Sequence, residues 1–271
     1  MRRRSVAAQL FMLAFLAYFL MPLFWLVVSS TKSLSDLFAS FGLWFAHDNN
    51  FVANVRQLLD TRTLDGGTYL LWMRNSMLYS ISSAVIAALA AAAAGYGFSK
   101  FSFRGREALF WLVLGTVMVP TQALATPTYL LFAKIGLTNS PWSIILPSSV
   151  IPFGVYLMRI YADRAVPIQL IEAARLDGAS EFRIFRSIAF RLLAPGFVTV
   201  ALFAFVATWN NYFLPLIMLS EPKWYPFTVG VRELGTTGAI TGSLLAIVPL
   251  IAAFLLLQRY WQSGLAAGSV H

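Results

Sequence analysis

The chain has no cysteine and few charged residues. Without cysteine it can form neither disulfides nor thiolate metal sites, and it has no cysteine nucleophile. Charged residues make up 11% of the sequence, whereas a soluble domain usually has about a quarter. Hydrophobic residues make up 59% and the mean hydropathy is +0.71, too much apolar surface for a globule of 271 residues to bury. The composition therefore predicts an all-α polytopic membrane protein.

The net charge of +9 does not indicate a nucleic-acid partner. A nucleic-acid-binding domain gathers its basic residues on one face. Here they lie in short segments between apolar runs, which is typical of the loops that anchor membrane spans. The partner that this charge pattern predicts is the lipid bilayer.

Six stretches are long and apolar enough to cross about 30 Å of hydrocarbon, which takes roughly 20 helical residues. They form one predicted transmembrane domain over residues 1–271, with spans at about 8–30, 75–98, 108–132, 140–160, 193–219 and 237–259. The first follows three arginines, as a signal peptide would. Its length and the lack of a small-residue cleavage site predict a retained helix instead.

Lys and Arg prefer the cytoplasmic side of short loops. With the N-terminus inside, 13 of the 20 Lys and Arg fall in inner segments and 7 in outer ones, so both termini are predicted to be cytoplasmic. The outer stretch from Lys32 to Arg74 is predicted to be a loop with one short interfacial helix. Residues 162–191 form the longest cytoplasmic loop.

Local signals in that cytoplasmic loop predict two short helices. Pro167 suits the start of a helix over Ile168–Asp177, and Gly178 suits the positive φ that often follows a helix end. Ser180 can cap the second helix. The predicted shared face of that helix holds Phe182, Phe185, Ile188 and Leu192. By periodicity alone, an amphipathic segment lying on the membrane surface is an equal alternative.

The literal string of this loop resembles a known motif. Glu172-Ala173-Ala174, Asp177-Gly178-Ala179, Phe185 and Ile188 are similar to the EAA loop of permease subunits in binding-protein-dependent ABC importers. The resemblance implies a coupling helix that docks into a separate ATPase subunit. The coupling residues it implies are Glu172 for a polar contact, Ala173 and Ala174 for close approach, and Asp177 and Gly178 at the turn.

One position departs from that pattern. Phe190-Arg191 stands where the family often has Leu-Pro, so a proline kink there is not expected, although Pro195 follows four residues later.

Three further strings resemble the maltose-type carbohydrate permeases, and they are Gly95–Gly105, Trp209–Leu216 and Gln258–Val270. The last is similar to the tail of the smaller of the two permease subunits. The resemblance implies a type I ABC importer permease fold in the bacterial cytoplasmic (inner) membrane and import of a sugar or sugar-like solute. It also implies a second permease subunit in a heterodimer, two ATPase subunits that bind ATP and Mg, and an extracytoplasmic solute-binding protein. No cofactor is expected on this chain.

Polar and aromatic residues in the fifth predicted span are candidates for the translocation path. They are Trp209, Asn210, Asn211 and Tyr212, whose amides and rings suit sugar hydroxyls and sugar faces. The alternative is that the amides bind a neighbouring helix and the rings anchor at the interface. In the third span, Pro120 and Pro127 favour a kink between packed helices.

The outer segment Glu221–Thr237 is rich in proline and glycine and is predicted to be irregular. In the maltose-type family the matching loop can probe the docked binding protein. The exposed candidates for that contact are Lys223, Trp224 and Tyr225, and an interfacial aromatic anchor is the alternative.

An ion-coupled secondary transporter of a small polar solute and a membrane-embedded enzyme are the alternatives to an importer subunit. An ion-coupled secondary transporter usually needs acidic or histidine groups within its spans, and the six stretches contain none. An enzyme needs a nucleophile with a base or a metal cluster, but the two histidines, His47 and His271, both lie outside the spans. No G-x-x-x-x-G-K-[ST] phosphate loop occurs. The chain is not expected to be an enzyme, and its energy must come from a partner.

Overall fold

The computed structural model describes residues 6–63 and 66–266, in which the regular secondary structure is helical apart from one isolated bridge between Arg62 and Thr68. Arg2, Arg3, Arg4 and the end of the tail string, 267–270, lie outside the described residues. The chain forms two compact units. Unit 1 comprises Met1–Leu71 and Gly230–Val248, and unit 2 comprises Trp72–Val229 and Pro249–His271.

Unit 1 contains α1 (Val6–Ser30), α2 (Leu34–Ala39), α3 (Phe51–Asp60), η4 (Val231–Glu233) and the first part of α14 (Thr236–Ala266). The outer stretch after α1 thus holds two short helices, where the sequence predicted one. Asn54 of α3 donates hydrogen bonds from Nδ2 to the carbonyl oxygens of Ser30 and Lys32, both at 2.9 Å. The buried Lys32 donates from Nζ to the Phe41 carbonyl at 2.8 Å. These bonds fix the end of α1 to α3.

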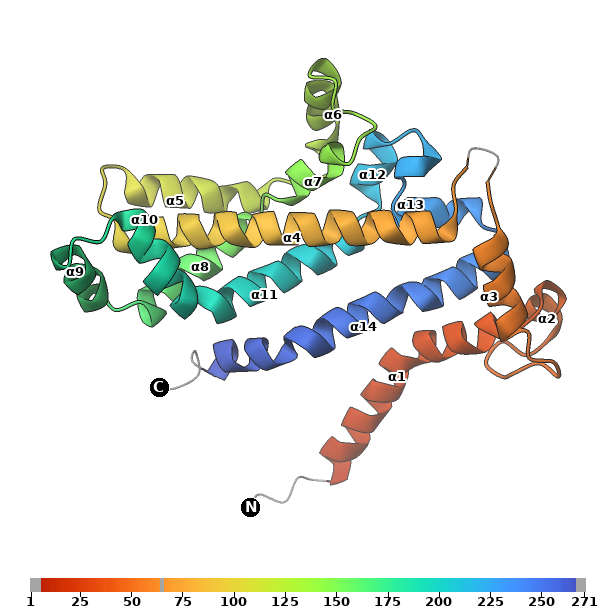
Figure 1. Cartoon of the computed structure of the whole chain (residues 1–271). Coiled ribbons are helices and arrows are strands. Elements are labelled where there is room, and N and C mark those ends of the chain that lie inside the picture. The colour runs from red at the N-terminus through yellow and green to blue at the C-terminus, as the bar shows by residue number, and fades with distance from the viewer. Residues whose placement is uncertain (1–5, 64–65, 267–271) are drawn as a thin grey trace. The chain divides into compact units, whose positions relative to one another are not determined.

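Unit 2 contains most of α4 (Tyr69–Lys100) and the elements that follow it. They are α5 (Arg106–Gly115), η1 (Thr116–Met118), α6 (Ala125–Lys134), α7 (Trp142–Ser148), α8 (Pro152–Ala165), α9 (Ile168–Leu176), α10 (Glu181–Ile184), η2 (Phe185–Ala189), α11 (Phe190–Trp209), α12 (Phe213–Met218), η3 (Pro222–Trp224) and α13 (Phe227–Gly230). In Figure 1, α4 and α11 are the long helices of this unit, and α9 and α10 lie near the end of α4 at Lys100.

The centre of unit 2 is a close crossing of α4 and α8. A Cβ atom on Gly95 would lie 2.5 Å from Met158 Cβ and 2.6 Å from the backbone nitrogen of Arg159, so only glycine permits this approach. Met158 is fully buried, and Val200 of α11 belongs to the same core. Small residues at a helix contact let backbones approach closely, as is common between membrane helices.

Within the described residues, four helices are long and apolar enough to cross a membrane, and α7 with α8, bent by 43°, makes a fifth candidate. The third predicted span, 108–132, is not one helix. It divides into α5 and α6 of 10 residues each, separated by η1 and a turn that includes Pro120. The predicted kink is therefore a complete break, and Pro127 lies harmlessly in the first turn of α6. The helix that corresponds to the fifth predicted span, 193–219, is Glu181–Trp209, which begins and ends earlier in the sequence.

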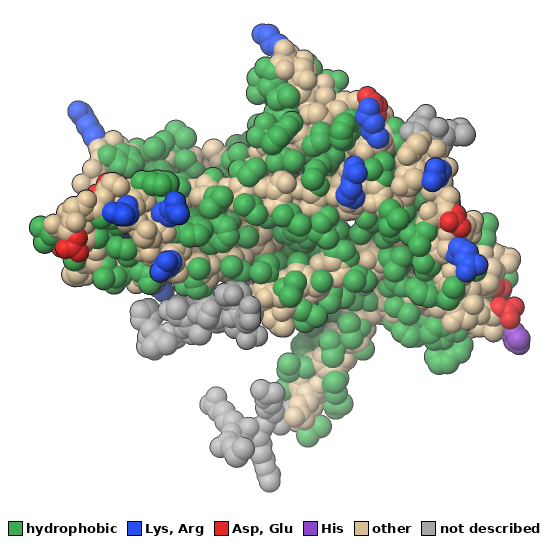
Figure 2. Space-filling view, in the orientation of Figure 1, with side chains coloured by type: hydrophobic (Ala, Val, Ile, Leu, Met, Phe, Trp, Pro, Cys, Tyr) green, Lys and Arg blue, Asp and Glu red, His purple; other side chains and the backbone are tan. Residues whose placement is uncertain are grey.

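The surface of unit 2 is divided by polarity. In Figure 2, hydrophobic side chains cover the middle of α4, whereas Lys and Arg side chains gather over α9 and α10. A hydrophobic middle with charged groups beyond it is the pattern expected for helices surrounded by lipid.

Candidate functional site: the coupling loop, its base and the outer loop

In the loop between α8 and α11, the first helix and the turn after it form where the local sequence predicted them, but the second helix continues into α11 through η2. Pro167 precedes α9 in an extended conformation, and α9 ends one residue before the expected Asp177. Gly178 has a φ of +77°, which favours glycine because a Cβ atom is strained there. Ser180 caps α10, its Oγ accepting a hydrogen bond from the Arg183 backbone N–H at 3.4 Å. Arg175 and Glu181 then join α9 to α10 by an ion pair of 2.6 Å, which raises the pKa of Arg175.

The two sides of α9 have different surroundings. Ile171 is fully buried and Ala174 is 8% exposed, and both pack into the core around Met158. Glu172 and Ala173 are exposed, and so are Asp177 and Gly178. The small side chain of Ala174 packs within this chain, so of the two alanines only Ala173 lies on the exposed side of α9. Leu176, which the motif did not single out, is 90% exposed.

The expected apolar face of the second helix is confirmed only in part. Phe185 and Ile188 pack against the core, whereas Phe182 is 72% exposed. The fully buried positions are Ile184, Ala189 and Leu193. The cause is η2, a turn of π-helix that places an extra residue between α10 and α11 and shifts the helical periodicity. The irregularity in this segment thus lies before Phe190-Arg191, and Pro195 lies inside the assigned helix α11.

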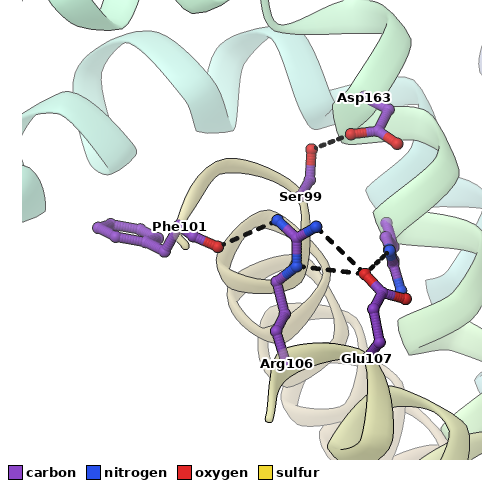
Figure 3. Close-up of polar contacts among 6 residues, drawn as sticks. Ser99, Phe101, Arg106, Glu107 and Asp163 are labelled. Atoms are coloured by element: carbon purple, nitrogen blue, oxygen red, sulfur yellow. Dashed lines mark hydrogen bonds and ion pairs between the residues drawn. The ribbon is translucent and has the colours of Figure 1, made fainter. Parts of the chain in front are cut away.

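Five charged or polar residues fix the base of the coupling loop, as Figure 3 shows. Ser99, near the end of α4, donates from Oγ to Asp163 Oδ1 of α8 at 2.6 Å. Glu107 of α5 accepts from Arg159 Nη2 of α8 at 2.6 Å and forms a second ion pair of 3.1 Å with Arg106. Three helices are joined here, and only four residues separate Asp163 from the start of α9.

The Arg159–Glu107 pair holds further contacts in place. The guanidinium carbon of Arg159 lies 4.1 Å from the centroid of the Phe110 ring, which is a cation–π geometry. Arg106 Nη1 donates to the Phe101 carbonyl at 3.3 Å and so closes the short loop between α4 and α5. The resemblance quoted for Gly95–Gly105 drew attention to this loop but assigned it no partner on α8.

Glu107 gives this base a defined pH dependence. The hydrogen bond from Arg159 holds the pKa of Glu107 below its usual value. A carboxyl group with a lowered folded pKa contributes stability above its unfolded pKa, and the contribution is lost as the pH falls through the folded value. We expect the thermal stability of Glu107→Gln to be lower than that of the parent at pH 7 and equal to it well below pH ~4. A difference in melting temperature that persists in acid would contradict this.

The outer loop, defined as residues 219–228, is held by one face of α4. Four buried side chains at spacing i, i+3, i+4 and i+7 contact its backbone. Trp72 donates from Nε1 to the Pro222 carbonyl at 2.9 Å, and Tyr79 donates from its hydroxyl to the Trp224 carbonyl at 2.8 Å. Asn75 donates from Nδ2 to the Lys223 and Tyr225 carbonyls at 2.8 and 3.0 Å. Ser76 Oγ accepts from the Phe227 N–H at 2.8 Å. The periodicity was visible in the sequence, but the partners lie about 150 residues away.

The three binding-protein contact candidates differ in exposure. Lys223 is exposed and forms an ion pair with Glu221, and Trp224 is half-buried. Tyr225 is 5% exposed and donates from its hydroxyl to the Ser220 carbonyl. The prediction of an exposed Tyr225 is wrong, because its ring belongs to the packing of the loop.

The four translocation-path candidates lie where α11 ends and α12 begins. Trp209 is 5% exposed and stacks on Phe205 at 5.6 Å. Asn210 donates to the Val206 carbonyl of its own helix, and Asn211 accepts from the Leu214 N–H at the start of α12. Both side-chain hydrogen bonds are therefore made to residues within four positions in the sequence, and not to another helix. Tyr212 is 45% exposed.

Among the residues that the structure describes, no group of three His, Cys, Asp or Glu side chains could hold a metal ion. Sequence comparison identifies the family of the chain. The family described as "Binding-protein-dependent transport system inner membrane component" matches residues 84–266, which include α9 and most of α4. The chain belongs to this family.

Relatives of this permease match it over most of their length. "Arabinooligosaccharides transport system permease protein AraQ" of Bacillus subtilis (strain 168) is 32% identical and covers 98% of this chain and 95% of its own. "Lactose transport system permease protein LacG" of Rhizobium radiobacter is 30% identical, over 95% and 92%. "Maltodextrin transport system permease protein MdxG" of B. subtilis is 34% identical, over 76% and 77%.

The fold of the permease also matches a solved structure, described as a bacterial ABC transporter involved in the import of the acidic polysaccharide alginate. The TM-score is 0.79 with 20% sequence identity, and the match covers 96% of this chain and all of the other. The permease therefore has the ABC importer permease fold. As an inner-membrane component of a binding-protein-dependent system, it is a non-enzymatic membrane subunit of an importer whose function requires a partner permease, an ATPase and a binding protein.

Proposed function

We propose that this permease imports an oligosaccharide or a similar sugar-like solute as the smaller subunit of a heterodimeric permease. The observation that carries the proposal is the full-length similarity to permeases named for arabino-oligosaccharides and lactose. An extracytoplasmic binding protein delivers the solute, and two ATPase subunits bind ATP and Mg and drive alternating access.

In this proposal the chain crosses the membrane six times with both termini in the cytoplasm. The six crossings are α1, α4, α5 with α6, α7 with α8, α10 to α12, and α14. The charge distribution supports the direction, since Lys100, Arg104 and Arg164 lie at the same end of unit 2 as the coupling loop.

The ATPase docks on the exposed side of the coupling loop. This surface, here called the docking surface, consists of Glu172, Ala173, Leu176, Asp177 and Phe182, with Gly178 shaping the turn. Leu176 and Phe182 are 90% and 72% exposed although they belong to the charged end of unit 2 rather than its apolar middle. Large apolar side chains grouped on a polar surface favour a protein partner.

Solute passage is proposed near the break between α11 and α12. Asn210 and Tyr212 are the exposed members of the four candidates, and Trp209 and Asn211 support them from beneath. If the transport selectivity of Asn210→Ala and Trp209→Ala is unchanged, the solute does not contact this region. At the outer loop, Lys223 and Trp224 remain the proposed contacts with the binding protein.

The experiment that tests the proposal is co-purification of the tagged permease from its native membrane, with an assay of the eluate for ATP hydrolysis. We expect the parent chain to bring down an ATPase and a second permease, and Glu172→Arg to lose the ATPase. Asp60→Arg makes the same charge change on exposed α3 and should lose nothing. If the parent chain elutes alone and transport is independent of ATP, the proposal is wrong.

A further inference from the structure

We propose that α4 is a mechanical link that carries the docking of the solute-binding protein from the outer loop to the coupling loop. The inference rests on the proposed function. The helix has 32 residues, and at about 1.5 Å per residue it spans about 48 Å. A single helix of that length reaches across a bilayer, so a displacement at one end arrives at the other without passing through a loop.

The outer end of α4 is bonded to the outer loop through buried groups. Trp72, Asn75, Ser76 and Tyr79 are each no more than 3% exposed, and each forms a hydrogen bond with a main-chain atom of the loop. Because these bonds are made to the main chain of the loop, they do not depend on which side chains the loop carries. Asn75 bonds two carbonyls two residues apart and thereby sets the local curvature. A partner that moves Lys223 or Trp224 therefore also moves the start of α4.

The other end of α4 is bonded to the helix that leads into the coupling loop. Gly95 packs directly on the backbone of α8, and Ser99 bonds to Asp163 at 2.6 Å. Tyr96 lies between these two residues and is 3% exposed, in one core cluster with Ile171 of α9 and Ile184 of α10. Its ring lies 5.2 Å from that of Phe185, the first residue of the π turn. Movement of α4 thus acts on α8, α9 and α10 together.

The face of α4 between its ends permits this role. Ala87, Ala88, Ala91 and Ala92 are nearly or fully buried there. Small side chains let neighbouring helices approach closely, and Ala88, Ala91 and Ala92 share one core cluster with Met158 of α8 and Val200 of α11. The middle of α4 is therefore packed as closely as its ends, and the helix moves as one body.

The test uses the complete importer, with partner permease, ATPases and binding protein, reconstituted in liposomes. ATP hydrolysis is measured with and without solute-loaded binding protein at saturating concentration. We expect Asn75→Leu to reduce the stimulation by the binding protein by about tenfold, which is usual for coupling between two sites, and to leave unstimulated hydrolysis intact. Ser80→Ala is the matched control, since the Ser80 hydroxyl is buried on the same helix and has no hydrogen-bond partner among the residues that the structure describes.

A second pair of variants examines the other end of the link. Asp163→Ala removes the acceptor for Ser99 and should reduce the stimulation as Asn75→Leu does. Asp163→Asn keeps an oxygen acceptor and should retain most of it. A merely structural role would not separate unstimulated from stimulated hydrolysis in this way.

A direct measurement uses the absence of cysteine from the chain. A spin label at Arg183→Cys, on exposed α10, should change mobility when the loaded binding protein docks, and Asn75→Leu should abolish that change. If saturating binding protein restores full stimulation in Asn75→Leu, or if the label still responds, the link is not α4. A parent complex that binding protein does not stimulate at all would instead contradict the proposed function.

Discussion

Replacing Gly95 with alanine is expected to cost about 2 kcal/mol or more of stability and to abolish transport. The added Cβ would meet Met158 Cβ at 2.5 Å and the main chain of α8 at 2.6 Å. Overfilling a packed core commonly costs 1–3 kcal/mol, and here main-chain atoms have to move. The measurement is the thermal unfolding of the purified permease in detergent, together with solute uptake.

The control for this prediction lies two residues further along the same helix. A Cβ on Gly97 would have no atom within 4 Å, so Gly97→Ala adds helix propensity without a clash. We expect its melting temperature to equal or slightly exceed that of the parent. Equal behaviour of the two alanine variants would show that the crossing of α4 and α8 is looser than described here.

Replacing Phe182 with aspartate is expected to remove the ATPase from the purified importer while the permease stays folded. The side chain is 72% exposed, so the chain itself loses little packing. An aromatic residue at the centre of an interface is often worth 2 kcal/mol or more, and therefore about 30-fold in the dissociation constant. The measurement is the affinity of the purified ATPase for permease in nanodiscs.

Val52 of α3 provides a matched comparison, because it is also 72% exposed and lies on the proposed outer side. Val52→Asp should bind the ATPase like the parent. Loss of binding in both variants would indicate a general defect in folding. Normal binding by Phe182→Asp would remove this residue from the docking surface and leave Glu172 as the contact to examine.

Short-range signals were read correctly from the sequence. Pro167, Gly178 and Ser180 each act within one turn of chain, so their roles at the ends of α9 and α10 follow from local conformation alone. The apolar composition likewise predicted the helical membrane fold. These features depend on few neighbours, and those neighbours are adjacent in the sequence.

The features that were missed depend on register or on distant partners. Hydropathy is uniform across residues 108–118 and cannot locate the break near Pro120, which depends on turn formation. The exposure of Phe182 was mispredicted because a regular period of 3.6 was assumed through a π turn. The bonds of Asn75 and of Arg159 join residues 148 and 52 positions apart, respectively, and no local pattern encodes them.

The π turn between Phe185 and Ala189 also means that chain length, and not only side-chain identity, determines which way the docking surface points. A π turn is an α-helical turn with one residue inserted. Successive residues of an α-helix are rotated by about 100°, so deletion of one residue here would turn α10 by that angle relative to α11. Phe182 would then face another direction although no residue of the docking surface had changed. We therefore expect a one-residue deletion at this point to weaken binding of the ATPase even though the docking surface keeps all its residues.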